Sequence, residues 1–142
     1  MRRCANYSRK QGKPVQPAQP VIAIVEDDVS IGRALSRLLH AVGWKAVTFT
    51  SAEAFLQTGL QEPPHCLVLD VRLPGMTGFE LLEHFAVAGI SLPVILITAH
   101  DNVQVRMRAA QAGVSAYLRK PVDEQDLLQA IRRALGLGAS TP

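Results

Sequence analysis

Short apolar runs that end in polar side chains constrain the fold of this chain more than any other feature. Three of them are unbroken: Val21–Val25, Cys66–Leu69 and Pro93–Ile97. Runs of four or five apolar residues are too short to cross a bilayer, and they are typical of strands buried on both faces of a parallel sheet. Two weaker strands are predicted at Lys45–Phe49 and Ser115–Arg119.

The segments between these strands carry apolar residues at helical spacing. Ile31, Leu35 and Leu39 lie on one face of a helix that Gly43 ends. Further helices are predicted after a Ser51 N-cap through Leu56, around Phe79–Phe85, over Asn102–Ala112 and around Leu127–Leu135. Strands that alternate with helices through right-handed crossovers define the α/β class. We therefore predict a doubly wound five-stranded parallel sheet with the flavodoxin-like strand order 2-1-3-4-5.

Charge separates a basic leader from the rest of the chain. Residues 1–20 carry five basic and no acidic side chains, which leaves residues 21–142 with ten basic and twelve acidic ones, a balance of −2. We expect a disordered leader at 1–20, a globular domain at 21–136 and a tail or linker start at 137–142. This balance argues against direct nucleic-acid binding by the domain.

Neither a secretory signal nor a membrane-spanning run is recognisable in the sequence. We therefore expect a cytoplasmic protein without membrane contact. The two cysteines do not suggest a disulfide framework, because Cys4 lies in the polar leader and Cys66 begins an apolar run. Cys66 is expected to be a buried, reduced thiol.

Polar residues gather where the predicted strands end. The strand-end residues are Glu26, Asp27 and Asp28 after the first strand, Asp70 after the third, Thr98 after the fourth and Lys120 after the fifth. The carboxyl ends of parallel strands share one edge of the sheet, where ligands bind in open α/β folds. The fold should therefore bring several carboxylates, a hydroxyl and one ammonium into one pocket.

Carboxylates at such close range repel one another unless a cation lies among them. Mg²⁺ suits this set, because it prefers oxygen ligands and combines one or two carboxylates with phosphate oxygens. A Ca²⁺ loop would need spaced ligands and a bidentate glutamate, and zinc would need His or Cys at the strand ends, where only His100 lies near. Two simpler interpretations stay open: Lys120 could form an ordinary salt bridge, and Thr98 could cap a helix.

Taken together, the four strand ends favour a phosphoryl-transfer site. Asp70 would attack a phosphorus atom, while Mg²⁺ and Lys120 neutralise the oxygens on which charge develops. Thr98 would donate a hydrogen bond to one of those oxygens. Each feature is weak alone, and the prediction depends on their occurrence at matching strand ends.

Four segments resemble the response-regulator receiver family of two-component signalling, in the order and at the spacing of that family. They are Val25–Asp28, Leu69–Gly78, Ile97–His100 and Ala116–Pro121, and the resemblance covers about residues 21–136. It implies that Asp70 is the phosphoacceptor and receives its phosphoryl group from a histidine kinase, a histidine phosphotransfer protein or a small phosphodonor.

The resemblance also implies a Mg²⁺ site. Asp27 and Asp70 would bind the ion directly, Glu26 would bind it through water, and the backbone carbonyl of Arg72 would be a further ligand. Asp28 is the remaining acid of the pocket and is expected to cap the first helix rather than to bind the ion.

For the phosphoryl group, the resemblance implies contacts with Thr98, the backbone of Ala99 and Lys120. The Lys120–Pro121 bond is expected to be cis, which would aim the lysine inward. Thr98 and Tyr117 resemble the family's switch pair, whose rearrangement changes the face formed by helix 4, strand 5 and helix 5. That face would bind a downstream protein or output domain, or form a phosphorylation-dependent homodimer.

Arg72 and His100 occupy the positions that flank the approach of the attacking water in this family, so we expect slow self-dephosphorylation and no other turnover. Together with Ser51–Leu56 they resemble receivers that precede LuxR-type helix-turn-helix domains. Three interpretations stay open: a single-domain regulator, a phosphorelay intermediate, or the receiver fragment of a longer DNA-binding transcription regulator.

Two other classes of protein share part of this pattern. Mg²⁺-dependent aspartyl phosphatases of the haloacid-dehalogenase type carry a second acid two residues after the nucleophile, where this chain has Arg72. Arginine cannot supply acid–base catalysis there. A flavin-binding module would share the fold, but its phosphate loop needs Ser, Thr and Gly where this chain has the acids that follow Val25.

Overall fold

The computed structural model describes residues 19–137, and within them it contains one five-stranded parallel sheet. The strand order is β2-β1-β3-β4-β5, which confirms the prediction. The strands are β1 (Val21–Val25), β2 (Lys45–Phe49), β3 (Cys66–Asp70), β4 (Val94–Thr98) and β5 (Ala116–Arg119). Every residue of β3 and β4 is buried, as the unbroken apolar runs indicated.

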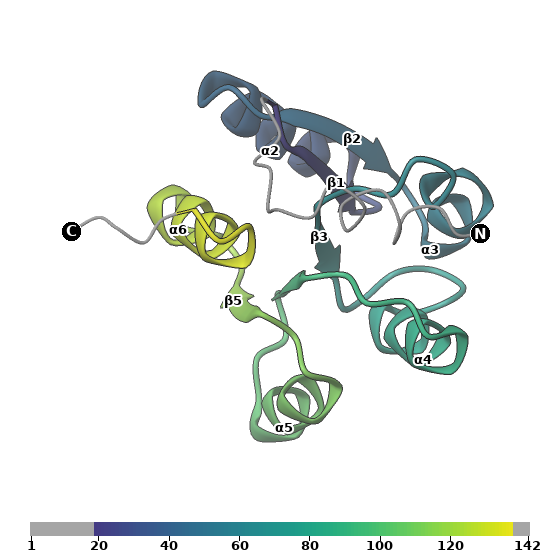
Figure 1. Cartoon of the computed structure of the whole chain (residues 1–142). Helices are drawn as coiled ribbons and strands as arrows, with labels where there is room; N and C mark the ends of the chain where they lie inside the picture. The colour runs from purple at the N-terminus through teal and green to yellow at the C-terminus, as the bar shows by residue number, and fades with distance from the viewer. Residues whose placement is uncertain (1–18, 138–142) are drawn as a thin grey trace.

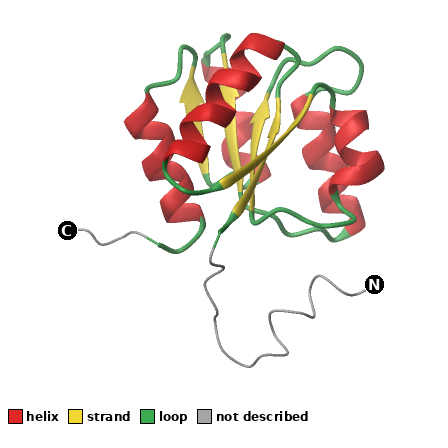
Figure 2. Ribbon diagram, turned by 90° about the horizontal axis from the view of Figure 1, so that it is seen from above, coloured by secondary structure: helices red, strands yellow, loops and turns green. Residues whose placement is uncertain are grey.

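Helices cover both faces of the sheet (Figures 1 and 2). On one face lie α2 (Val29–Ala41) and α6 (Glu124–Ala134); on the other lie α3 (Ala52–Ala54), α4 (Gly78–Ala88) and α5 (Val103–Ala112). Alternate side chains of each strand point to opposite faces, so that Ile22 and Ile24 pack with α2 and α6 while Ala23 and Val25 pack on the other side. The sheet therefore separates two apolar cores.

Most helices begin at a side-chain cap. The carboxylate of Asp28 accepts a hydrogen bond from the backbone N–H of Ile31 at the start of α2, which confirms the capping role expected for this acid. Thr77 and Glu80 form a reciprocal capping box at the start of α4. These caps satisfy backbone N–H groups that have no partner within the helix.

The second crossover differs from a regular helix. Ser51 caps α3 as predicted, but α3 is a single turn and the chain continues as the π-helix η1 (Phe55–Gly59). The ring of Phe55 lies where a Cβ at Gly59 would be, and Phe55 is fully buried. The π-helical turn thus places the ring of Phe55 against Gly59 and inside the core.

The predicted termini mostly lie outside the described residues, which exclude 1–18, with Cys4, and 138–142. At the inner boundaries, the Pro20 carbonyl accepts a hydrogen bond from Lys45 N–H, and Leu137 N–H donates to the Arg132 carbonyl. Cys66 is a buried free thiol, and desolvation raises its pKa to about 12. Among the described residues, no helix is both long and apolar enough to cross a membrane.

Candidate functional site

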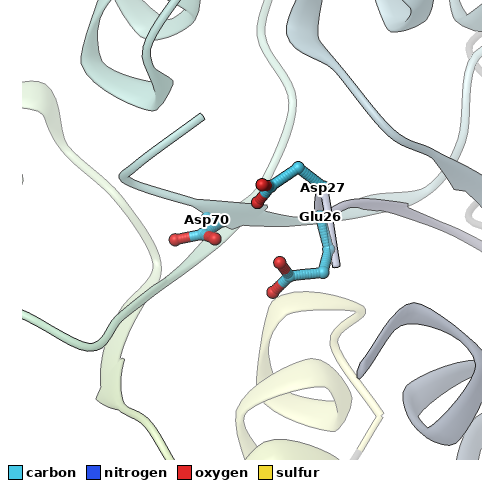
Figure 3. Close-up of side chains that lie close together, drawn as sticks. All are labelled: Glu26, Asp27 and Asp70. Atoms are coloured by element: carbon cyan, nitrogen blue, oxygen red, sulfur yellow. The ribbon is translucent and has the colours of Figure 1, made fainter. Parts of the chain in front are cut away.

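Three carboxylates meet at the carboxyl edge of the sheet. Glu26 and Asp27 directly follow β1, and Asp70 is the last residue of β3, the neighbouring strand (Figure 3). One oxygen of each carboxylate lies within 4.8 Å of the others. Glu26 and Asp70 are each 3% exposed, whereas Asp27 faces solvent. The predicted gathering of acids at this edge is therefore present.

Lys120 joins the two buried carboxylates. Its Nζ lies 2.7 Å from Glu26 Oε1 and 2.9 Å from Asp70 Oδ2. Backbone pairing fixes the base of this side chain, since Lys120 N–H donates to the Thr98 carbonyl at 2.8 Å. The Lys120–Pro121 peptide bond is cis, as the resemblance implied. The ammonium thus lies inside the acidic cluster.

Burial and charge oppose each other at this ion pair. Desolvation raises the pKa of Glu26, the nearby Asp70 charge adds to this, and hydrogen bonds from Lys120 and from the backbone of Asp28 only partly offset it. For Lys120, desolvation acts to lower the pKa, but the hydrogen bonds to Glu26 and Asp70 and their charges raise it overall. Lys120 is therefore charged at neutral pH and compensates the two carboxylates.

The cluster fits a small, hard divalent cation. All its side-chain donors are carboxylate oxygens, which Mg²⁺ prefers. Oε1 of Glu26 is buried, and within residues 19–137 it faces the Lys120 ammonium at 2.7 Å. Asp27 supplies a carboxylate that is open to solvent. The residues present therefore fit the Mg²⁺ ion that the resemblance to receiver domains implies.

The loop after β3 folds tightly over Asp70. Arg72 N–H donates to Asp70 Oδ1 at 3.1 Å, and Gly78 N–H donates to the Val71 carbonyl at 2.9 Å. A Cβ at Gly78 would lie 2.5 Å from the Asp70 carbonyl oxygen, so only glycine fits this approach. Beside the loop opens a cleft of about 480 Å³, whose lining includes Asp27 and Arg72.

Thr98 ends β4 and is fully buried. Its Oγ1 accepts a hydrogen bond from His100 N–H at 2.9 Å, and β4 lies between β3, which carries Asp70, and β5, which Lys120 directly follows. Ala99 and His100 are exposed. The Thr98 hydroxyl therefore lies at the same carboxyl edge of the sheet as the acids. Its hydrogen bond closes a local turn, and the N-cap of α5 is Asn102 instead.

Tyr117, on β5, points its hydroxyl toward a residue that the sequence analysis missed. It donates to Asp101 Oδ1 at 2.8 Å, and Asp101 also pairs with Arg106 at 2.9 Å and Arg119 at 3.5 Å. Desolvation, the hydrogen bond and the Asp101 charge raise the pKa of Tyr117 to about 12. The hydrogen bond from Tyr117 and the two guanidinium groups lower the pKa of Asp101.

An open parallel α/β sheet with an acid cluster, a hydroxyl and an ammonium at its carboxyl edge defines a class of doubly wound domain whose ligand site lies at that edge. Comparison with known families is consistent with that class. Residues 22–132 match the model of the response regulator receiver domain. The chain belongs to this family, whose members are the receiver domains of two-component systems.

Individual relatives agree with this assignment. The chain is 40% identical over 111 residues to nodulation protein W of Bradyrhizobium diazoefficiens, covering 78% of this chain and 49% of that protein. It is 34% identical over 123 residues to the transcriptional regulatory protein FixJ of Azorhizobium caulinodans, covering 87% and 58%. The chain thus spans about half the length of these relatives.

A solved receiver protein from Burkholderia phymatum superimposes with a TM-score of 0.75 at 42% identity, covering 87% of this chain and 100% of that one. The receiver fold therefore extends over the described residues of this chain.

Replacing the ammonium tests the electrostatics of the site. Lys120→Met leaves two buried carboxylates uncompensated, so the metal-free variant should lose about 3 kcal/mol of unfolding free energy at neutral pH. Part of this loss should return at about pH 5, because a carboxyl whose folded pKa lies above its unfolded value, as for Glu26, stabilises the fold once protonated. Urea unfolding followed by the fluorescence of Trp44, the single tryptophan, measures both effects. The exposed Lys45→Met is the control, and equal stability of the two variants would contradict the role of the ion pair.

Proposed function

We propose that this chain is a phosphoacceptor that takes a phosphoryl group on Asp70 with Mg²⁺ and relays its phosphorylation state to a partner. The observation that carries the proposal is the position of the Asp70 carboxylate. Its Oδ1 accepts from Arg72 N–H and its Oδ2 from Lys120 Nζ, with the acids Glu26 and Asp27 beside it. An aspartate held by two donors next to a cation-binding set is oriented for in-line attack.

The chemistry is a displacement at phosphorus. A carboxylate oxygen of Asp70 forms the new P–O bond, while the P–N bond of a phosphohistidine or the P–O bond of an acyl phosphate breaks and its electron pair leaves with the donor. Lys120 offsets the charge on the phosphoryl oxygens, and Thr98 and the backbone of Ala99 donate hydrogen bonds to them. Mg²⁺, when bound by Asp27, Asp70 and the Arg72 carbonyl and through water by Glu26, supplies charge neutralisation.

We propose slow self-dephosphorylation as the only turnover of this site. Arg72 and His100 are both exposed, and Arg72 lines the cleft that reaches Asp27. Bulky side chains at these positions restrict the path of an attacking water. An arginine at position 72 cannot act as the second acid that an aspartyl phosphatase would need.

The switch is proposed to involve Thr98 and Tyr117. Phosphorylation would draw the buried Thr98 hydroxyl toward the phosphoryl oxygens and give Tyr117 room to turn inward. In the structure described here, the hydrogen bond to Asp101 holds the Tyr117 hydroxyl at the β4–α5 loop. Inward rotation must break that bond, so Asp101 stabilises the resting state relative to the active one.

The partners of this chain are proposed from the family and from the surface of α5. A histidine kinase or histidine phosphotransfer protein would donate the phosphoryl group in the cytoplasm. Val103 and Met107 of α5 are 62% and 56% exposed, which supports binding of an output domain, a downstream protein or a second copy at the face of α5, β5 and α6. The length of the relatives supports a longer regulator.

Asp70→Asn tests the phosphoacceptor. Incubation with acetyl phosphate and Mg²⁺ should label the unaltered protein once, and the variant should take no label because an amide oxygen is a far weaker nucleophile than a carboxylate. Intact-mass spectrometry measures the label, and omission of Mg²⁺ should remove most of it. The exposed helix cap Asp123, changed to asparagine, is the matched control. Label retained in Asp70→Asn would place the acceptor elsewhere.

Arg72→Asn tests the slow hydrolysis. A smaller side chain opens the path of the water, so the acyl phosphate should decay roughly tenfold faster, which corresponds to about 1.4 kcal/mol of activation free energy. The decay of the label after removal of acetyl phosphate gives the rate. Arg37→Asn, on the exposed side of α2, should decay as the unaltered protein does. An unchanged rate in Arg72→Asn would refute the proposed shielding.

Asp101→Ala tests the resting-state contact of the switch. Loss of the acceptor should lower the pKa of Tyr117 from about 12 toward its ordinary value, as measured by NMR of labelled tyrosine. Labelling by acetyl phosphate should accelerate roughly two- to fivefold, because the resting state loses stability relative to the active one. In a Tyr117→Phe background the same substitution should change the labelling rate little, since no hydroxyl remains. An equal acceleration in both backgrounds would contradict the contact.

A further inference from the structure

Glu53 reaches from α3 to the loop that follows β3. Its Oε2 accepts a hydrogen bond from the backbone N–H of Met76 at 2.8 Å, across 23 residues of sequence. Gly75, the preceding residue, has a φ of +77°, and a Cβ there would lie 2.5 Å from the same oxygen. The hydrogen bond to Met76 and the close approach to Gly75 together place the carboxylate against the tip of this loop, where the positive φ of residue 75 favours glycine.

The ends of the same loop are attached to the phosphoacceptor strand and to α4. At one end Arg72 N–H donates to Asp70 Oδ1, and Gly78 N–H closes the loop onto the Val71 carbonyl. At the other end the Thr77 capping box begins α4. Within residues 19–137, the tip of this loop is held by a side chain from outside the loop, because the Glu53 carboxylate accepts the hydrogen bond from Met76 N–H.

Glu53 also stands on a fixed base. Its neighbour Ala52 and the nearby Phe55 are both 0% exposed, and Ser51 caps the turn by accepting from Ala54 N–H at 3.0 Å. The hydrogen bond from Met76 lowers the pKa of Glu53, so the carboxylate is ionised at neutral pH. A charged acceptor on an anchored turn forms a stronger hydrogen bond than a neutral one.

We propose that Glu53 is a positioning residue of the phosphoryl site, which holds the loop over residues 72–77 so that Arg72 meets Asp70 and presents its carbonyl to Mg²⁺. Glu53 itself is not a member of the acid cluster formed by Glu26, Asp27 and Asp70. The expected effect on Mg²⁺ binding rests on the proposed function. The hydrogen bond between Glu53 and Met76, which we call the clamp, is a property of the metal-free chain. Residues that orient the groups around a metal alter its affinity without binding it.

The first test measures the clamp without metal or phosphodonor. Amide hydrogen exchange of Met76, followed by NMR, should be slow in the unaltered protein and at least roughly tenfold faster in Glu53→Ala, because the N–H loses its acceptor. Glu53→Gln keeps an oxygen acceptor and should retain most of the protection. Glu62→Ala removes an exposed glutamate in the next loop and should change nothing. Equal exchange in all four proteins would overturn the clamp.

The second test measures the consequence for the site. Glu53→Ala should weaken Mg²⁺ binding, measured by titration calorimetry, about three- to tenfold, and should raise the Mg²⁺ concentration for half-maximal labelling by the same factor. Labelling at saturating Mg²⁺ should fall less, because the ion restores the loop when it binds. Glu53→Gln should lie within roughly twofold of the unaltered protein, and Glu62→Ala should match it. Loss of Mg²⁺ affinity in Glu53→Gln equal to that in Glu53→Ala would overturn the hydrogen-bond assignment.

A double-variant cycle separates positioning from general damage. Gly75→Ala pushes a methyl group toward the Glu53 carboxylate, so its effect on Mg²⁺ affinity should be larger in the unaltered protein than in a Glu53→Ala background. Additive effects would overturn the direct contact. Failure of the unaltered protein to accept label at Asp70 would instead refute the proposed function and leave the exchange result for Met76 intact.

Discussion

One ammonium group between two buried carboxylates is the interaction on which the rest of this structure depends. Glu26 and Asp70 lie at the ends of neighbouring strands, where water cannot screen their mutual repulsion. Lys120 contacts both carboxylates, and its single positive charge offsets part of their repulsion at the carboxyl edge of the sheet. Asp27, which faces solvent beside them, leaves the cluster open to a further cation. The fold and the chemistry of the site therefore share one electrostatic requirement.

The fold and the strand-end residues could be predicted because both depend on simple periodic patterns. A strand buried on both faces has to be apolar along its whole length, and polar side chains are tolerated only where it leaves the core. Parallel pairing then places Glu26, Asp70 and Lys120 at one edge whatever the loops do. Their proximity follows from topology alone, which is why sequence reasoning reached it.

Contacts that depend on loop conformation were not predictable in this way. Asp101 accepts a hydrogen bond from Tyr117, 16 residues away, and Glu53 accepts one from Met76, 23 residues away. Neither spacing corresponds to the period of a helix or a strand. The π-helical turn at Phe55–Gly59 was missed for a similar reason, since the predicted helix pattern ended at Leu56. One signal was present: the Gly75 and Gly78 pair marked a loop in which backbone comes unusually close to other atoms.

The place of β5 in the strand order has a mechanical consequence. Within residues 19–137 β5 is the last strand of the sheet and hydrogen-bonds to β4 on one side only, and three of its four residues are half-buried rather than buried. Displacing β5 would disturb one hydrogen-bonded ladder, whereas displacing β3 would disturb two. Backbone pairing is thus unevenly distributed, because the strand that carries Asp70 is held on both sides and the strand that carries Tyr117 on one. Under the proposed switch, a change of charge at Asp70 would move a strand that backbone hydrogen bonds hold on one side only.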